Sequence, residues 1–422
     1  MATIAPRPPL KQLDTALAEL LAFARVLPEV ERVSTFDADT RVLAQDVVSP
    51  LQVPPQDNSA MDGYALRYAD LPHAGVVLPV SQRIPAGSAG IALQPGTAAR
   101  IFTGAPIPAG ADAVVMQEDC EALAQDVVAG DTPSQGPAVR VNKLPRLGQN
   151  IRRAGEDVTL DAVVLQQGTR LTPAALGLAA SVGQAELGVV RRPRVALFST
   201  GDELVMPGDV APQDMKPGAI FNSNRFFQRA LLVRLGCTVT DMGIVPDRLD
   251  ATIDTLREAS LAHDLVLTCG GISVGEEDHV RPAVSALGEL DMWQLSIKPG
   301  KPFAYGRVGA AHFIGLPGNP VSSLVTFMLL VRPFLLRLQG VRDVAPRAVM
   351  LRADFAWPRP DRRREFLRVR HNGAGGLDLF ANQSSGVLTS AVWGDGLVDT
   401  APNTVIAPGD TVRFLSFADL LA

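Results

Sequence analysis

Cysteine is scarce in this chain: only Cys120, Cys237 and Cys269 occur among 422 residues. The three are far apart, odd in number and never in a CxxC spacing, so neither a disulfide framework nor a zinc-ribbon pattern is present. The five histidines are equally scattered and form no HxxxH pair, which argues against a zinc enzyme of the common types. Because free cysteines suit a reducing compartment, we expect a cytoplasmic protein.

The chain also lacks a long apolar run and an excess of positive charge. Residues 1–11 contain no apolar signal-peptide core. The most apolar helical stretch begins at Val321 and meets Arg332 after 11 residues, which is too short to span a bilayer. The formal net charge is −5, whereas a general nucleic-acid binder carries a basic surface. We therefore expect neither a membrane nor a nucleic-acid partner.

Glycine and proline are in excess, with 37 and 33 copies, about 17% of the chain against an ordinary share of about 12%. This excess predicts many turns and short elements. Hydrophobic residues make up 47% and charged residues 20%, which is an ordinary globular balance. At roughly 150 residues per domain, the length suggests about three domains.

The N-terminal half has helical segments on both sides of a β-rich region. Apolar residues recur at helical spacing over 10–27, and Thr172-Pro173 is a good start for a helix over 174–181. Between them, over 49–146, short β-branched runs alternate with Pro, Gly and Ala clusters. We expect a discontinuous helical linker domain, residues 1–48 and 147–190, into which a β domain of residues 49–146 is inserted.

Strands and helices alternate over 191–340, which predicts an α/β domain with a doubly wound parallel sheet. Its buried strands are expected at 195–199, 238–244, 264–269, 293–297 and 311–314. Its helices are expected at 221–235, 249–263 and 320–338. Over 341–422 helical patterns vanish, and short strands predict a small C-terminal β-barrel. Those strands are expected at 348–353, 365–370, 386–388, 404–406 and 411–415.

The loops that follow the five α/β strands predict one ligand site. In an open α/β sheet the ligand lies outside the carboxyl ends of the strands. Each of the five ends is followed by glycines and polar or charged residues. Glycines let a backbone approach an anion closely, and a helix start such as the one behind Gly318-Asn319-Pro320 attracts phosphate. Lys298 and Lys301 add compact positive charge for phosphate or an oxyanion.

Carboxylates complete the same set of loops. Glu203, Asp247 and Asp278 are hard oxygen ligands that suit Mg²⁺, so the rim indicates phosphate-ester or phosphoanhydride chemistry with a metal. Taken singly, each feature has a structural alternative: Glu203 as a helix cap, or Lys298–Pro302 as a solvated turn. The run of arginines at 362–364 is most often a solvated face.

Two polar segments of the N-terminal half are simplest to interpret as structural loops on composition alone. Together with four segments of the α/β region, however, they resemble the molybdopterin molybdenumtransferase family, the molybdenum insertases, which also form the C-terminal part of gephyrin-like proteins. The matching segments are Asp57–Ala65, Arg100–Pro106, Phe198–Leu204, Gly270–Asp278, Lys298–Pro302 and Gly315–Ser322. The resemblance covers nearly the whole chain. It implies four domains, two of them interleaved, in an elongated homodimer. It also implies Mg²⁺-dependent insertion of molybdenum from molybdate into adenylylated molybdopterin, with release of AMP.

The resemblance carries roles over to individual residues. Those tied to activity are Asp62, Thr103, Glu203, Asp247 and Asp278, with Asp247 and Asp278 as the metal ligands. Those expected to bind substrate are Thr200, Gly201, Gly270, Gly271, Ser273, Gly275, Lys298, Lys301, Pro302, Gly318, Asn319, Pro320, Arg363 and Ser384. Arg363, with Ser384 or Ser385, is implied to complete the oxyanion site across the dimer interface.

Two residues differ from those common in the family, and two alternative functions stay open. Cys269 stands where the family commonly has serine, and His279 where it has an aromatic residue, so we expect altered packing rather than altered chemistry. Adenylylation of molybdopterin with ATP uses a similar α/β domain, but the extra domains and the Asp62 and Thr103 segments count against it. A non-catalytic molybdopterin-binding scaffold is opposed by the complete acidic and lysine motifs. Because no adenylyltransferase domain is fused, we expect transient contact with a separate molybdopterin adenylyltransferase.

Overall fold

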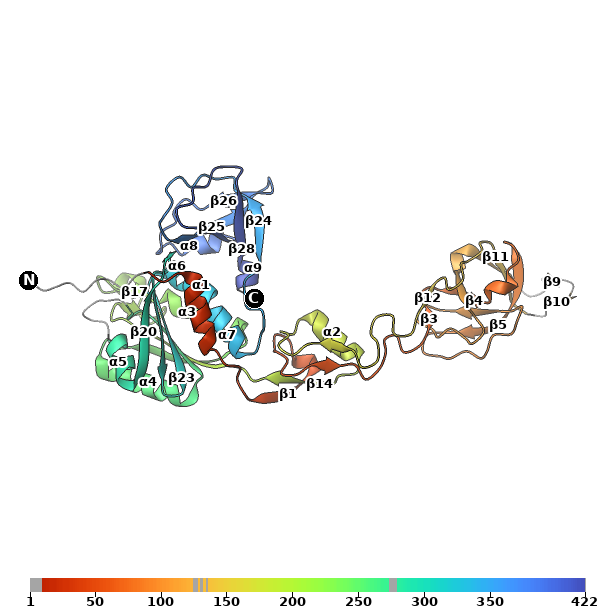
Figure 1. The fold of residues 1–422 in the computed structure, drawn as a ribbon, viewed down its shortest axis with the longest axis horizontal. Coiled ribbons are helices and arrows are strands. Elements are labelled where there is room, and N and C mark those ends of the chain that lie inside the picture. The colour runs from red at the N-terminus through yellow and green to blue at the C-terminus, as the bar shows by residue number, and fades with distance from the viewer. Residues whose placement is uncertain (1–9, 124–127, 130–131, 134–135, 273–278, 422) are drawn as a thin grey trace, which may run out of the picture. The chain divides into compact units, whose positions relative to one another are not determined.

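A computed structural model describes residues 10–123, 128–129, 132–133, 136–272 and 279–421 of the chain (Figure 1). The chain forms two compact units, each of them discontinuous in sequence. The first unit comprises Met1–Gln45, Gln167–Thr172 and Leu187–Ala422. The second comprises Asp46–Gln166 and Pro173–Glu186.

A six-stranded sheet forms the α/β part of the first unit, in the order β18-β15-β19-β23-β22-β20. The strands are β15 (Arg194–Thr200), β18 (Thr238–Val245), β19 (Leu265–Cys269), β20 (Gly288–Gln294), β22 (Pro302–Val308) and β23 (Ala311–Leu316). Only β22 runs against the others. β22 was not predicted, because it begins with Pro302, which is typical of the preceding turn. The carboxyl ends of the other five strands share one edge, as expected.

Helices cover both faces of this sheet, which is therefore doubly wound. They are α1 (Leu13–Phe23), α3 (Ser223–Arg234), α4 (Leu249–Ala262), α5 (Val280–Leu287), α6 (Pro320–Thr326) and α7 (Arg332–Leu338). Alternate residues of β15 separate the two cores: Val195 and Leu197 face α1, α3, α6 and α7, whereas Ala196 and Phe198 face α4 and α5. The predicted helix over 10–27 is shorter than expected, and α5 was not anticipated.

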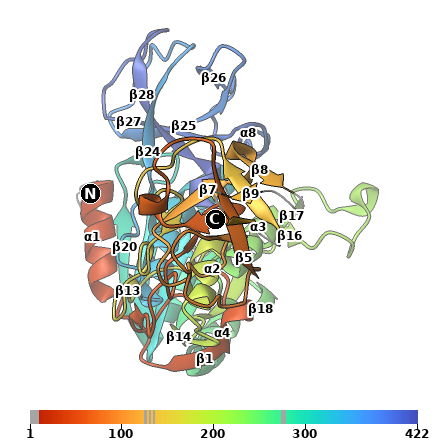
Figure 2. The same cartoon turned by 90° about the vertical axis from the view of Figure 1, so that its right-hand side faces the viewer.

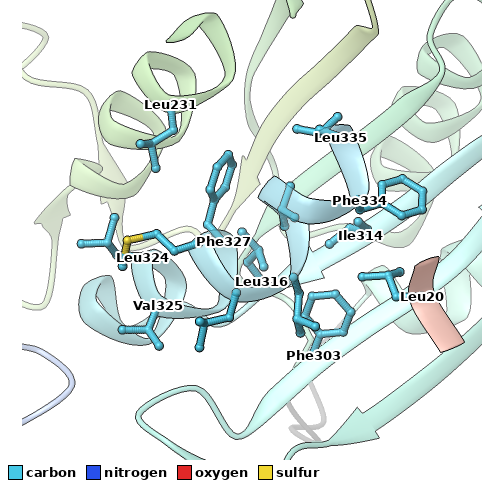
Figure 3. Close-up of a cluster of buried hydrophobic side chains, with 14 of the residues drawn as sticks. Leu20, Leu231, Phe303, Ile314, Leu316, Leu324, Val325, Phe327, Phe334 and Leu335 are labelled. Atoms are coloured by element: carbon cyan, nitrogen blue, oxygen red, sulfur yellow. The ribbon is translucent and has the colours of Figure 1, made fainter. Parts of the chain in front are cut away.

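The helix Pro320–Leu338 lies at the centre of the larger core, joined through a π-helical segment, Phe327–Val331 (Figure 3). Phe327 and Phe334 are both at most 1% exposed. Among the residues that the structure describes, this one helix is long and apolar enough to cross a membrane, but 94% of it is buried inside the molecule. It continues through Arg332, so it is longer than the apolar run read from the sequence. Its burial identifies it as a core helix.

A second sheet of the first unit contains the C-terminal strands, in the order β21-β25-β27-β28-β24, with β26 paired to β25 (Figure 2). The elements are β21 (Ile297–Lys298), β24 (Ala348–Arg352), β25 (Arg364–His371), β26 (Leu377–Leu379), α8 (Thr389–Trp393), β27 (Gly396–Thr400), β28 (Thr411–Ser416) and α9 (Phe417–Leu420). The strand predicted at 386–388 is wrong, because those residues lie in a turn region. The strand predicted at 404–406 is reduced to a single β-bridge between Ile406 and Trp357, and β27 was missed. The parallel pairing of β21 with β25 places Lys298 opposite Glu365.

The second unit contains a six-stranded sheet in the order β7-β4-β6-β5-β11-β8. Its strands are β4 (Gly63–Leu66), β5 (Val76–Ile84), β6 (Ala98–Ile101), β7 (Ala113–Met116), β8 (Cys120–Leu123) and β11 (Ala138–Val141). β4 is buried and lies within the segment that composition alone read as a loop. Its apolar partners Val115 and Ala99 lie on neighbouring strands, and the short run Gly63–Leu66 was too brief to be recognised as a strand.

The remaining elements are short. In the first unit they are β1 (Val30–Ser34), β14 (Glu186–Val190), β16 (Leu204–Val205) and β17 (Ile220–Phe221), with β1 paired to β14 and β16 to β17. In the second unit they are β2 (Val47–Val48), β3 (Asn58–Ser59), β9 (Val128–Ala129), β10 (Thr132–Pro133), β12 (Ile151–Arg152), β13 (Val163–Leu165) and α2 (Pro173–Ser181).

Candidate active site

A cavity of about 440 Å³ lies at the carboxyl edge of the α/β sheet. It is lined by the residues that follow β15, β19 and β23, and by the start of α3. Seven of the predicted substrate-binding or catalytic residues line it: Thr200, Glu203, Gly270, Pro302, Gly318, Asn319 and Pro320. These residues come from four loops up to 120 positions apart in sequence, and the folding of the sheet brings them together.

Gly270 lines this cavity, and Gly271 follows it in the same loop. Their φ angles are +93° and +66°, a region that favours glycine. A Cβ atom on Gly270 would stand 2.9 Å from the carbonyl oxygen of Thr200. A Cβ atom on Gly271 would stand 2.5 Å from the Val280 side chain and 2.7 Å from Thr200 Oγ1. Both glycines are therefore required where this loop crosses the end of β15.

Buried hydrogen bonds hold the opposite wall, the loop between β23 and α6. The Cys269 thiol donates to the carbonyl oxygen of Pro317 at 3.2 Å. The Asn224 carboxamide donates to the carbonyl oxygen of Gly318 at 2.6 Å and lies 3.0 Å from Cys269 Sγ. Burial raises the pKa of the Cys269 thiol, so the group stays protonated and able to donate. Asn224 was not anticipated, because it belongs to a helix start rather than a strand end.

Lys298 lies in a cluster of paired charges contributed by the C-terminal sheet. Its Nζ is 3.1 Å from Glu365 Oε1 and 3.4 Å from Asp361 Oδ2. Arg363 holds both oxygens of Asp361, at 2.9 Å and 2.8 Å. Hydrogen bonding from Arg363, with the charge of Lys298 adding to it, keeps the pKa of Asp361 well below its ordinary range. Trp357 Nε1 donates to Glu365 at 2.9 Å.

Asp361 thus joins Lys298 and Arg363 within one chain, and the implied role of Arg363 across a dimer interface stays a prediction. The arginine run at 362–364 is a solvated face only in part: Arg362 is exposed, whereas Arg363 pairs with Asp361 at 2.8 Å and Arg364 with the nearly buried Asp399 at 2.6 Å. Sequence reasoning missed Asp361 and Glu365. Asp361 and Glu365 flank the arginines in the sequence, but no sequence pattern connects them to Lys298, which is 63 positions from Asp361.

The predicted serines lie in the loop that precedes α8, and Ser385 contacts the start of α6. The carbonyl oxygen of Ser385 accepts a hydrogen bond from the Val321 backbone at 2.9 Å, again within one chain. Ser384 precedes it, and its carbonyl oxygen accepts from Arg368 at 3.2 Å. Lys301 is placed by its backbone, whose carbonyl oxygen accepts from Leu295 at 2.6 Å. Gly201 links Thr200 to Glu203 and does not itself line the cavity.

Asp247 lies at a separate, open hollow of about 480 Å³, together with Arg248, Asp250 and His279. Its backbone N–H donates to Asp202 Oδ1 at 3.2 Å, which places the Asp202 carboxylate beside the Asp247 backbone. Asp278, Ser273 and Gly275 lie outside the described residues. Within the described ranges no group of three His, Cys, Asp or Glu side chains has the geometry of a metal site. Asp202 and Asp247 fit a hard cation chemically, but as an incomplete set.

Asp62 and Thr103 belong to the second unit, where they contact each other. Asp62 Oδ1 accepts from the Thr103 backbone N–H at 2.7 Å and from the Thr103 hydroxyl at 2.8 Å. The backbone hydrogen bond, followed by the hydroxyl, lowers the pKa of Asp62. Asp62 and Thr103, which were predicted from separate segments, thus lie in contact. The Asp62 carboxylate is ionised, and Thr103 fixes its orientation.

Family models match almost the entire length of the chain. The "MoeA N-terminal region (domain I and II)" matches residues 11–183. The "Probable molybdopterin binding domain" matches residues 196–337. The "MoeA C-terminal region (domain IV)" matches residues 350–417. The fold and its cavity therefore define a multidomain protein built around a molybdopterin-binding α/β domain.

Relatives give the particular family. Molybdopterin molybdenumtransferase of Haemophilus influenzae is 42% identical over 78% of this chain and 78% of its own length. Molybdopterin molybdenumtransferase 2 of Mycobacterium tuberculosis is 37% identical over 88% of this chain and 91% of its own. A crystal structure of the molybdopterin biosynthesis moeA protein from Pyrococcus horikoshii has a TM-score of 0.81 at 27% identity. That match covers 97% of this chain and 100% of the other. The chain belongs to the molybdopterin molybdenumtransferase family of transferases, which confirms the resemblance drawn from its six segments.

Proposed function

We propose that this protein takes molybdate and adenylylated molybdopterin as substrates, inserts the molybdenum into the pterin dithiolene and releases AMP. The observation that carries the proposal is the cavity at the carboxyl edge of the sheet, because seven residues expected to bind this substrate or act on it line it. Its volume of about 440 Å³ is in the range of small-molecule sites.

The residues divide by chemistry. The backbone of Gly270 and of Gly318–Pro320 faces the cavity that would take the pterin nucleotide. Lys298 and Arg363, with Lys301, supply the positive charge for the oxyanion. Glu203 lines the cavity as an acid-base candidate. The Asp62–Thr103 pair supplies an ionised carboxylate, which the family resemblance ties to activity.

The metal and the assembly are the finer parts of the proposal. Asp247 with Asp278 would hold Mg²⁺, which would neutralise phosphoanhydride charge when bound. Asp202, whose carboxylate accepts from Asp247 N–H, is a further oxygen ligand at the same rim. We also propose a cytoplasmic homodimer that contacts a separate molybdopterin adenylyltransferase transiently. The family resemblance supports this assembly, and sedimentation of the purified protein tests it.

A mass-balanced turnover assay tests the reaction. Purified protein, adenylylated molybdopterin, Mg²⁺ and molybdate are mixed, and AMP release and pterin-bound molybdenum are followed together. Release of AMP that depends on molybdate, with equal molybdenum in the pterin, supports the insertase. In a parallel reaction that contains ATP and free molybdopterin, consumption of ATP would point to an adenylyltransferase. Tight binding of adenylylated molybdopterin without AMP release under any oxyanion would point to a scaffold.

A further inference from the structure

Asp361 occupies the space between the two cations of the charge cluster. Its carboxylate receives two hydrogen bonds from the Arg363 guanidinium, at 2.9 Å and 2.8 Å, while Lys298 Nζ stands 3.4 Å from the same group. A fork of two N–H donors plus an ammonium is the arrangement by which proteins hold tetrahedral oxyanions. The carboxylate of Asp361 therefore lies where an oxyanion bound by Lys298 and Arg363 would lie.

The second carboxylate of the cluster cannot play this part. Glu365 has a side chain only 2% exposed, and its Oε2 accepts from Trp357 Nε1 at 2.9 Å and from the Asp361 backbone at 3.0 Å. Moving it would leave buried donors without an acceptor. The Asp361 side chain is 22% exposed and that of its donor Arg363 is 27% exposed, so when Asp361 turns outward, water or an incoming anion can accept from the donors that it leaves.

The charge of an incoming anion determines whether it displaces the Asp361 carboxylate. Lys298 and Arg363 carry two positive charges, and Asp361 and Glu365 carry two negative charges, so the cluster is neutral as it stands. When Asp361 turns outward, the remaining three groups carry a net charge of +1. An incoming dianion gains more from these cations than the monovalent carboxylate it replaces, whereas a monoanion gains no such advantage.

We propose that Asp361 is a specificity-determining residue, an internal anion that the substrate oxyanion must displace from Lys298 and Arg363. The inference rests on the proposed function, since it takes these two cations as the oxyanion site. Asp361 lowers the affinity for all oxyanions, and it lowers the affinity for monoanions more than that for molybdate-like dianions.

Equilibrium dialysis of the full-length protein against molybdate, with nitrate as the monovalent probe, tests this. Asp361→Asn and Asp361→Ser remove the negative charge; the serine hydroxyl still accepts from the Arg363 backbone, as Asp361 Oδ1 does at 3.0 Å. We expect both variants to bind molybdate about tenfold more tightly, close to 1.4 kcal/mol, and to bind nitrate where the parent protein does not.

Asp354→Asn is the matched control. Asp354 makes the same kind of two-bond pair with an arginine two positions away, Arg352, at 2.7 Å and 3.0 Å, and none of its recorded partners is a lysine. This variant should bind molybdate as the parent does. Unchanged or weaker molybdate binding in both Asp361 variants, with parent binding intact, would overturn the inference and leave the proposed function standing. If Arg363→Ala binds molybdate as tightly as the parent, the oxyanion site itself is misplaced.

Discussion

The carboxamide nitrogen of Asn224 lies 3.0 Å from Cys269 Sγ, and the two side chains hold consecutive carbonyl groups of one loop. Asn224 binds Gly318 and Cys269 binds Pro317. Both side chains are less than 10% exposed. The wall of the cavity is thus positioned by two buried donors beneath it, one from the start of a helix and one from the end of a strand.

Two replacements of Cys269 distinguish the hydrogen bond that its thiol donates from the packing of its side chain. Cys269→Ser keeps a hydroxyl donor to Pro317, so it should leave the KM for adenylylated molybdopterin nearly unchanged. Cys269→Ala leaves the Pro317 carbonyl without this donor, at a cost of about 1–3 kcal/mol in unfolding free energy, and should raise KM several-fold. Cys237→Ala is the control: it removes a buried thiol from the larger core and should lower stability without changing KM. Equal KM values for all three variants would remove the positioning role.

Gly271 and Gly318 offer a matched pair of alanine substitutions. Gly271→Ala forces a side chain into a φ of +66° and against Val280 and Thr200, so we expect a loss of roughly 2 kcal/mol or more in stability. Gly318→Ala points its Cβ into open space and should melt like the parent protein. Thermal melting followed by circular dichroism measures both. Equal melting temperatures would show that the Gly271 loop relaxes freely.

The Asp62–Thr103 pair predicts a graded loss of turnover. Asp62→Ala removes the carboxylate and should lower kcat for AMP release on the order of 10²-fold or more if the carboxylate acts in catalysis. Thr103→Val removes the hydroxyl bond but keeps the backbone bond, which is the larger cause of the lowered pKa, so its loss should be about tenfold or less. Thr103→Ser restores the hydroxyl and should approach parental kcat. A Thr103→Val enzyme slower than Asp62→Ala would contradict this order.

His312 predicts a stability that depends on pH. Burial lowers the pKa of His312 from 6.5 to about 4, and its Nδ1 lies 2.9 Å from the Tyr305 hydroxyl. The folded state excludes a proton that the unfolded chain takes up, so this contribution is present above pH 6.5 and is lost as pH falls from 6.5 toward 4. Between pH 7 and pH 5 the parent should lose up to about 2 kcal/mol more than His312→Gln.

Urea unfolding of the full-length protein at the two pH values, followed by circular dichroism, measures this difference. The exposed His73→Gln variant in the second unit is the control and should follow the parent. If His312→Gln loses as much unfolding free energy between pH 7 and pH 5 as the parent, groups other than His312 cause that loss.

The α/β domain was predictable because its signals are local. Val195–Ser199 and 264–269 are short apolar runs followed by glycines, and four of the five expected strand positions coincide with strands of the sheet. β22 escaped prediction because Pro302 and Gly306 conceal a strand whose partners lie on both sides of it. β4 was not predicted, because four residues bounded by turns are too few to show a strand periodicity. Its pairing with β6 and β7 makes it a buried strand.

The sequence by itself determined the family, the α/β architecture and the residues that gather at the cavity, because these depend on strand ends and ordered motifs that read along the chain. Tertiary structure alone decided the environment of those residues. Glu365 reaches Lys298 through the β21–β25 pairing, and Asn224 reaches Gly318 across 94 positions. Charge pairing and buried hydrogen bonds depend on distance in space rather than in sequence. Two arginines of the run that composition interprets as a solvated face, Arg363 and Arg364, therefore form ion pairs in the folded protein.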